Sequence, residues 1–188
     1  MQTHFLFDVL EGYQPFEQIA EESRRDGAVI AASGLAGAQK AHPACALAAK
    51  TGRPLVFLCD SERSAAQTME DVSALMGGGV SLFPAREITF YQAVAASRDV
   101  AYRRIEAMRK LVSGEVRAIV APVDAMLHRV MPRAVFSANT ISLRVGDVLP
   151  TDQLIERLLA AGYTREYMVE GKGQFSVRGG IVDIFSPA

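Results

Sequence analysis

The sequence contains no tryptophan, only two cysteines and no excess of positive charge. The cysteines, Cys45 and Cys59, do not form a C-x-x-C pair, which argues against a disulfide framework and against a zinc site. Such sparse cysteine usage is typical of a reducing compartment, so we expect a cytoplasmic protein. The formal net charge of −1 argues against a generally basic surface for nucleic acid.

Motifs of catalysis and membrane insertion are absent as well. No apolar run is long enough to span a bilayer, and the first residues show no basic-then-apolar leader pattern, so we expect no membrane contact. The sequence contains neither G-x-S-x-G nor H-E-x-x-H, and its histidines lack metal-ligand spacing: His4, His42 and His128. We therefore predict no catalytic residue, no metal and no cofactor. Because the last residues directly follow a strand-like run, we expect a longer parent polypeptide.

Hydrophobic residues make up 49% of the 188 residues, enough for a substantial core in one medium domain with a smaller addition. In the first three quarters, short apolar runs alternate with helical patterns, which favours a parallel, doubly wound sheet. The predicted strands are residues 28–32, 55–59, 80–83 and 118–121. The predicted helices include residues 43–50, 65–75 and 101–111. We predict an α/β domain over residues 1–136.

The pattern changes near residue 139, and we predict a smaller α+β module over residues 137–188. Leu154 and Leu158 lie on one face of a predicted helix that Thr151 caps and Gly162 ends. Strand-like runs follow, which we expect to pair in an antiparallel sheet: residues 163–169, 175–178 and 181–185.

Residues Gly34 to Ala41 match parts of a phosphate-binding loop, G-x-x-x-x-G-K-[ST], and lack others. Gly34 and Lys40 are present, but Gln39 replaces the second glycine and Ala41 replaces the Ser/Thr. In a working loop the glycine lets backbone N–H groups wrap the phosphates, and the hydroxyl binds Mg²⁺. We therefore predict a degenerate nucleotide site that no longer binds ATP.

Several charged residues have both a structural and a functional interpretation. Asp60 follows an apolar strand, as the Mg²⁺-binding aspartate of an ATPase does, but we favour a helix cap by Asp60 or Ser61, and we interpret Asp124 similarly. We interpret a basic stretch as a solvated helix face rather than a phosphate-contacting one: Arg103, Arg104, Arg109 and Lys110.

The glycine-rich tail of the sequence is typical of a β-hairpin. Gly179-Gly180 is predicted to form a tight two-residue turn that uses positive φ. Phe175 and Val177 then share one face of the strand, and Ser176 and Arg178 share the other. An arginine beside the turn stands out from the sheet, where it either meets a carboxylate of a partner or remains a solvated strand residue.

This tail closely resembles the N-terminal region of the bacterial transcription-repair coupling factors, often called Mfd. Similar segments extend over nearly the whole chain: Leu82 to Glu87 with Phe90-Tyr91 nearby, Val120 to Val130, Gly162-Tyr163, Met168 to Glu170, and Gly171 to Pro187. That region of the family is in turn similar to the front of UvrB, the excision-repair helicase. The resemblance therefore implies a helicase-like α/β domain with a degenerate P-loop, plus a smaller module like the second domain of UvrB.

By resemblance, this module recruits UvrA to RNA polymerase stalled at a DNA lesion, in transcription-coupled nucleotide excision repair. The family's hairpin arginine contributes to UvrA binding and matches Arg178, with Phe175 and Gln174 expected as weaker neighbouring contacts. The family's ATP-driven DNA translocase, and its contacts with RNA polymerase and DNA, lie in other domains. The same region of the family packs against the C-terminal part of the full-length protein in a repressed state. The alternatives are an ATP-binding helicase or ATPase fragment and a DNA-binding domain.

Overall fold

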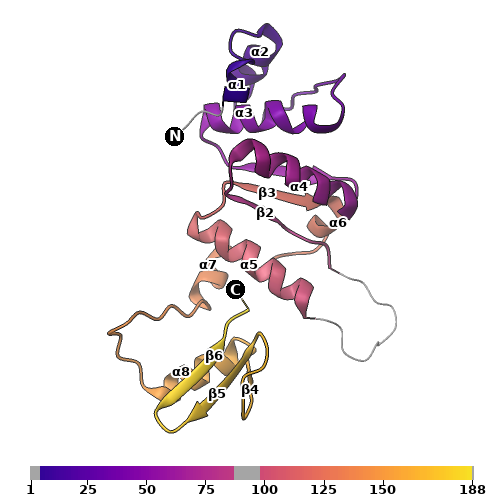
Figure 1. The fold of residues 1–188 in the computed structure, drawn as a ribbon. Coiled ribbons are helices and arrows are strands. Elements are labelled where there is room, and N and C mark those ends of the chain that lie inside the picture. Colours follow the sequence, from indigo (N-terminus) through magenta and orange to yellow (C-terminus); the bar gives the residue numbers. More distant parts are fainter. Residues whose placement is uncertain (1–4, 87–97, 188) are drawn as a thin grey trace. The chain divides into compact units, whose positions relative to one another are not determined.

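The computed structural model describes residues 5–86 and 98–187, which belong to two compact units, Met1–His128 and Arg129–Ala188 (Figure 1). Each unit has a hydrophobic core of its own. Helix α7 (Arg133–Ala138) extends across the boundary predicted at residue 136. Some residues named in the sequence predictions lie outside the described part of the chain: His4, Glu87 and Phe90-Tyr91.

The first unit contains a parallel sheet of three strands: β1 (Leu55–Cys59), β2 (Val80–Leu82) and β3 (Ala118–Pro122). Their order is β1-β3-β2, and Ala118 of β3 is in register with both Leu55 and Val80. The expected parallel sheet is therefore confirmed. A non-sequential order of this kind needs crossover connections, and helices supply them between these strands.

The strand predicted at residues 28–32 is wrong. These residues have no strand geometry, and Val29 is 97% exposed while Ile30 is 38% exposed. An apolar run fits a buried strand only if a neighbouring strand satisfies its backbone N–H and C=O groups. No neighbour does so within the described residues, so the run remains irregular.

The central strand β3 is buried on both faces. Ala118 and Val120 face one core cluster, and Ile119 and Ala121 face another, because side chains alternate along a strand. Strand β1 differs, since its Val56 and Leu58 are more than half exposed. The predicted strand at residues 55–59 is thus present, but it is buried mainly on one face.

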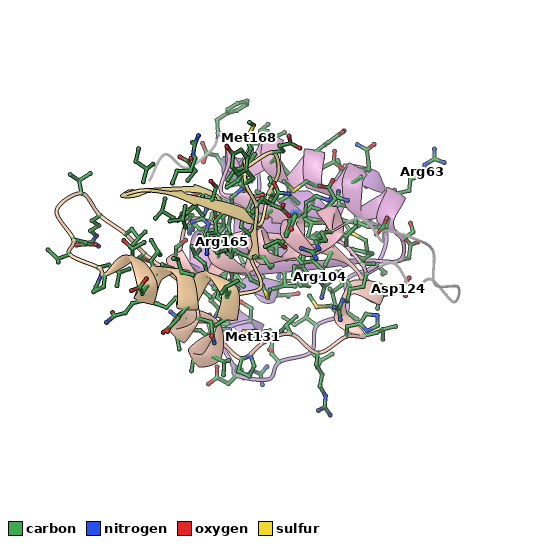
Figure 2. All side chains as sticks on the ribbon, turned by 90° about the horizontal axis from the view of Figure 1, so that it is seen from below. Arg63, Arg104, Asp124, Met131, Arg165 and Met168 are labelled. Carbon is green, nitrogen blue, oxygen red and sulfur yellow. The ribbon has the colours of Figure 1, made fainter. Side chains whose placement is uncertain are left out.

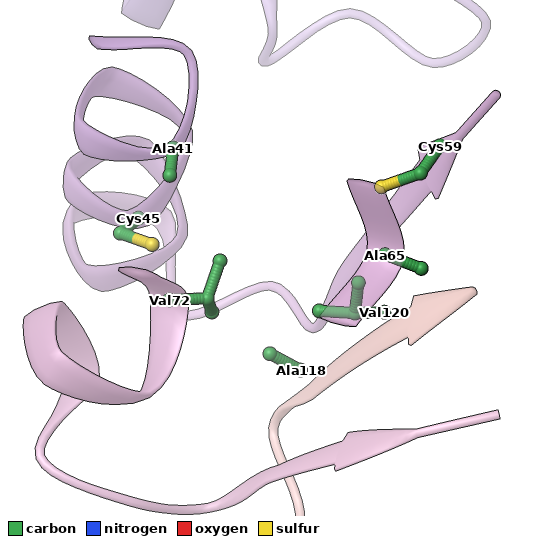
Figure 3. Close-up of a cluster of buried hydrophobic side chains, with 7 residues drawn as sticks. All are labelled: Ala41, Cys45, Cys59, Ala65, Val72, Ala118 and Val120. Carbon is green, nitrogen blue, oxygen red and sulfur yellow. The ribbon is translucent and has the colours of Figure 1, made fainter. Parts of the chain in front are cut away.

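Helices cover the two sides of this sheet. Helices α3 (Ala41–Thr51) and α4 (Glu62–Met76) lie on one side and α5 (Asp99–Ser113) on the other (Figure 1). Small side chains from α3 and α4 meet the sheet in the cluster of Figure 3, where Cys45 and Val72 are fully buried. The remaining helices of the unit are short or precede α3: α1 (Phe5–Asp8), α2 (Gln14–Glu22), the 3₁₀ helix η1 (Gly37–Gln39) and α6 (Val123–Met126).

The second unit contains helix α8 (Thr151–Ala160) and a three-stranded sheet of β4 (Thr164–Arg165), β5 (Gln174–Arg178) and β6 (Ile181–Phe185). Strands β5 and β6 are antiparallel as predicted, but β4 is only two residues long and runs parallel to β5. The prediction of a wholly antiparallel sheet was therefore wrong. The segment between β4 and β5 returns the chain to the end of the sheet where β4 began, so β5 runs in the same direction as β4.

The core of the second unit lies between α8 and one face of this sheet. Leu154 and Leu158 pack there against Phe175, which has no exposed surface. Gly162 follows the helix with a φ of 84°, as predicted for a stop. Thr151 is the first helical residue rather than the cap, because Pro150 occupies the capping position and leaves no side-chain cap. Among residues 5–86 and 98–187, no helix is long and apolar enough to cross a bilayer.

Candidate functional site

The hairpin of β5 and β6 turns through Gly179 and Gly180, as predicted. Arg178 pairs with Ile181 across the turn, and Gly179 has a φ of 59°. Only the first of the two glycines has a positive φ, which is the pattern of a type II′ turn. The turn connects the strands with the shortest common loop, so the register of the side chains on both strands is well defined.

Register divides the hairpin into a covered face and an open face. Phe175 and Val177 belong to the covered face, which packs against α8. The other face carries Arg178, with Ile181 opposite it, Asp183 diagonal to it and Phe185 at the far end of β6, opposite Gln174. We call these four residues the open face: Arg178, Ile181, Asp183 and Phe185. Ile181 is 63% exposed and Phe185 is 44% exposed, so apolar surface is available there.

The segment between β4 and β5 borders this open face. The hydroxyl of Ser176 donates a hydrogen bond to the carbonyl of Tyr167 at 3.1 Å, and Ser176 is 1% exposed. The side-chain oxygen of Gln174 accepts hydrogen bonds from the backbone N–H groups of Glu170 (2.9 Å) and Gly171 (2.8 Å). These contacts hold the segment over the inner half of β5 and leave Arg178 beyond it.

Two large side chains of this segment face solvent. Tyr167 is 89% exposed and Met168, labelled in Figure 2, is 61% exposed. Exposed Tyr, Met and Arg side chains are enriched in protein interfaces relative to other surfaces. Sequence reasoning missed these two residues together with Ile181 and Phe185. The alternation of the β6 run, counted from the two-residue turn, was the signal that would have placed Ile181 and Phe185 on the same face as Arg178.

Arg178 forms an ion pair within the open face. Its Nη2 lies 2.5 Å from Oδ2 of Asp183, and the two side chains are 62% and 42% exposed. The pair is diagonal, because Asp183 is opposite Ser176 rather than opposite Arg178. The predicted solvent-facing arginine is thus present, but it already has an acidic partner in its own hairpin.

The other two residues predicted to contact a partner have different positions. Phe175 is fully buried against α8 and offers no surface to another protein. The alternation of side chains along β5 correctly placed Phe175 and Arg178 on different faces of the strand. It did not reveal which of the two faces the helix covers. Gln174 is half-buried and acts within the unit, where its amide oxygen holds the backbone of Glu170 and Gly171.

The loop from Gly34 to Ala41 does not have the geometry of a phosphate site. No strand precedes it, and residues 28–40 are all exposed. The side-chain oxygen of Gln39 accepts the N–H of Ala36 at 3.1 Å, so the loop satisfies part of its own backbone. Ala41, which stands where a working loop has its Mg²⁺-binding hydroxyl, is 2% exposed and packs in the core cluster of Figure 3.

Ser61, the residue after Asp60, caps helix α4. The Ser61 hydroxyl accepts the N–H of Ser64 at 3.2 Å, and Asp60 accepts hydrogen bonds from the hydroxyls of Ser64 and Ser61. These two hydrogen bonds lower the pKa of Asp60. The interpretation as a cap at the start of α4 is therefore confirmed. Asp124 is not a cap: Pro122 occupies the capping position of the short helix α6, and Asp124 lies inside its first turn, so the corresponding interpretation of Asp124 is wrong.

Other reactive groups do not assemble into a site in the described part of the chain. Residues 5–86 and 98–187 contain no group of three potential metal ligands. Cys45 is fully buried, and burial raises the pKa of its thiol to about 11, so the reactive thiolate is not formed near neutral pH.

The basic stretch on α5 does not form a continuous basic face. Arg104 is 6% exposed, donates to the carbonyl of Pro84 at 2.6 Å and stacks over the ring of Phe83 at 4.0 Å. The other cations are paired with carboxylates, Arg109 with Glu115 and Lys110 with Glu106, apart from the exposed Arg103. The predicted solvated face is therefore wrong for Arg104, which is a core residue.

Comparison with known proteins connects the second unit of this chain to a family. Residues 141–188, which include α8 and all three strands of the second sheet, match the family model described as the UvrB interaction domain. The chain is also 34% identical over 184 residues to the transcription-repair-coupling factor of Myxococcus xanthus, an alignment that covers 94% of this chain. The chain belongs to the transcription-repair coupling factor family. The predicted family resemblance is confirmed.

Further relatives carry the same description. The chain is 32% identical to the transcription-repair-coupling factor of Bacillus subtilis over 81% of its length, and 30% identical to that of Mycobacterium tuberculosis over 71%. The chain spans only 13% of the length of the Bacillus subtilis relative and 15% of that of Myxococcus xanthus. Most of the length of those proteins therefore lies outside the aligned part.

Proposed function

We propose that this chain is a non-catalytic, UvrA-binding part of a transcription-repair coupling factor. One observation carries the proposal: the match to the UvrB interaction domain coincides with the unit whose sheet has an open face. Binding of UvrA would bring the excision machinery to RNA polymerase stalled at a lesion, in transcription-coupled nucleotide excision repair. Such a role belongs to the cytoplasm, which fits the two buried cysteines that form no disulfide.

The chemistry of the open face supports a protein partner. The open face combines the charged fork of Arg178 with exposed apolar side chains, Ile181 opposite it and Phe185 farther along β6, and such combinations of Arg with aromatic or aliphatic side chains are typical interface anchors. A guanidinium recognises carboxylates through parallel N–H groups. We therefore propose that Arg178 binds a carboxylate of UvrA while Ile181 and, farther along β6, Phe185 pack against apolar side chains of UvrA. Gln174 supports this face indirectly, because it holds the neighbouring segment in place.

For the first unit we propose the role of a scaffold derived from a helicase-like, nucleotide-binding domain. The parallel sheet order and the glycine-containing turn before α3 support that origin. The buried Ala41 and the self-bonded Gln39 support the loss of nucleotide binding. In the parent protein, the ATP-dependent translocase and the contacts to DNA and RNA polymerase belong to other domains. We also propose that the UvrA-binding part contacts the C-terminal part of the parent protein when that protein is repressed.

Replacement of the arginine tests the proposal. We expect Arg178→Ala to weaken UvrA binding at least about tenfold, because loss of a charged hydrogen-bonded contact in an interface costs ~2–5 kcal/mol. Calorimetric titration of the purified chain with UvrA measures the affinity. Arg157→Ala is the matched control, since Arg157 is also exposed but lies on α8, which covers the opposite face of the sheet.

The possible outcomes separate the parts of the proposal. Loss of affinity in Arg178→Ala but not in Arg157→Ala, with unchanged melting temperatures, supports the open face as the binding surface. Equal affinities of the Arg178→Ala variant and the unchanged chain would remove Arg178 from the site. Absence of any UvrA binding by the unchanged chain would overturn the proposed function itself.

A further inference from the structure

The ion pair on the open face differs from another arginine pair in this chain. Arg109 binds Glu115 with two nitrogens, Nη1 to Oε1 at 2.5 Å and Nη2 to Oε2 at 2.9 Å. Arg178 binds Asp183 with Nη2 to Oδ2 alone, at 2.5 Å. A two-armed pair fixes the orientation of a guanidinium, whereas a single arm leaves the other N–H donors pointing elsewhere. The Arg178 pair is therefore the easier of the two to exchange.

Register explains why the contact has one arm. Ser176 is opposite Asp183 and Arg178 is opposite Ile181, so the ion pair spans a diagonal of the antiparallel ladder. Diagonal neighbours on one face are ~7–8 Å apart at their Cα atoms. The aspartate side chain is short, so the long arginine side chain spans most of this distance. Arg178 must bend along the sheet to reach Asp183, and it can instead extend away from the sheet.

The position of Asp183 matters because apolar residues flank it. Ile181 and Phe185 lie two residues before and after Asp183 on the same face of β6. A partner that packs on both apolar side chains also covers the carboxylate between them. Covering a carboxylate removes its hydration, and this is unfavourable unless a cation or hydrogen-bond donor compensates. A second carboxylate brought by the partner adds like-charge repulsion.

We propose that Asp183 is an internal competitor that occupies Arg178 in the free protein and is displaced when an acidic group of the partner binds. The inference rests on the proposed function, since it concerns the same face and the same partner. Asp183 lowers the affinity of that face, and it also makes binding selective. A purely apolar surface cannot replace the lost ion pair, whereas a carboxylate on the partner can.

A charge-removing substitution with a double-mutant cycle tests the competition. Asp183→Asn keeps the size and an acceptor oxygen but removes the charge, and we expect it to bind UvrA about threefold more tightly at low salt, since both charges are solvent-exposed. We expect this gain to disappear in the double variant with Arg178→Ala, because the competitor then has nothing to occupy. Glu156→Gln on α8 is the control for loss of one exposed negative charge on the same unit.

The outcomes keep this inference separate from the proposed function. If Arg178→Ala weakens binding but Asp183→Asn leaves it equal or weaker, Asp183 is not a competitor and instead orients the arginine. If Asp183→Asn tightens binding equally with and without Arg178, or if Glu156→Gln does the same, the effect is one of overall charge and the inference is overturned. If Arg178→Ala binds as tightly as the unchanged chain, Arg178 is not in the site and this inference falls while UvrA binding stands. If the unchanged chain does not bind UvrA at all, the proposed function itself fails.

Discussion

The two units of this chain bury their sheets in different ways. In the first unit, helices cover both sides of the central strand β3, so Ala118 and Val120 pack on one side and Ile119 and Ala121 on the other. In the second unit, α8 covers only one face of the sheet. A sheet covered on both faces can bind a partner only at its ends or edges. In the second sheet, the segment between β4 and β5 covers only the inner half of β5, and Arg178 and Ile181 stay exposed at defined spacing. The difference points to the second unit as the interaction surface.

The two units also use glycine-containing turns differently. The Gly34 loop keeps part of a nucleotide-site motif, but no strand precedes it and Ala41 is buried in the core. The turn at Gly179 has no catalytic motif, yet it aligns Arg178, Ile181 and Asp183 on one face. A motif thus has chemical meaning only where the surrounding structure aims its groups at a ligand.

The largest difference in stability is expected between alanine substitutions on the covered face and on the open face of the hairpin. Phe175→Ala removes a fully buried ring from a small core, and we expect it to destabilise the second unit by ~3–5 kcal/mol. Phe185→Ala, on the open face with 44% exposure, should cost less than ~1.5 kcal/mol. Urea unfolding followed by circular dichroism measures both, which suits a chain without tryptophan. Similar losses for the two variants would mean that the sheet has no distinct open face.

The turn should tolerate alanine at only one of its two glycines. Gly179 has a φ of 59°, so Gly179→Ala forces a side chain into the left-handed region and should cost ~1–2 kcal/mol. Gly180 lacks a positive φ and has open space where the Cβ of an alanine would lie, so Gly180→Ala should change stability by less than ~0.5 kcal/mol. The same unfolding measurement compares them, and the reverse order would contradict the type II′ turn.

In the first unit, the smallest effect should come from the two-armed pair of Arg109 and Glu115. The hydrogen bonds from Arg109, and then from Ser113, lower the pKa of Glu115 from 4.5 to about 2. A depressed carboxyl pKa stabilises the folded state above the unfolded pKa, and the stabilisation is lost as pH falls from about 4.5 towards 2. Glu115→Gln should remove this contribution to the loss of folding stability at low pH.

Melting temperatures of the unchanged chain and of Glu115→Gln, measured between about pH 6 and pH 2.5, test this pH dependence. We expect the difference between the two proteins to shrink as the pH falls, because the unchanged carboxylate becomes protonated. A difference that stays constant over this range would show that the Arg109 contact does not depend on the charge of Glu115.

Local patterns in the sequence were reliable wherever short-range chemistry decides the structure. The 4-3-3 spacing of Ala65, Met69, Val72 and Leu75 predicted α4, and the glycine after it ends the helix in a left-handed conformation. The alternation around Gly179-Gly180 predicted the hairpin and placed Phe175 and Arg178 on opposite faces. The pattern could not show that Asp183 pairs with Arg178, because that contact depends on how far the two side chains reach across the ladder.

The amino-acid sequence by itself determined where the main helices lie, where the hairpin turns, and which side chains share a strand face, because these depend on backbone preferences and on residues a few positions apart. The tertiary structure decided that residues 28–32 form no strand, that β4 runs parallel to β5, and that α8 covers Phe175 and leaves Arg178 exposed. Those outcomes depend on which distant segments satisfy the backbone and bury apolar surface, and periodicity along one chain does not contain that information.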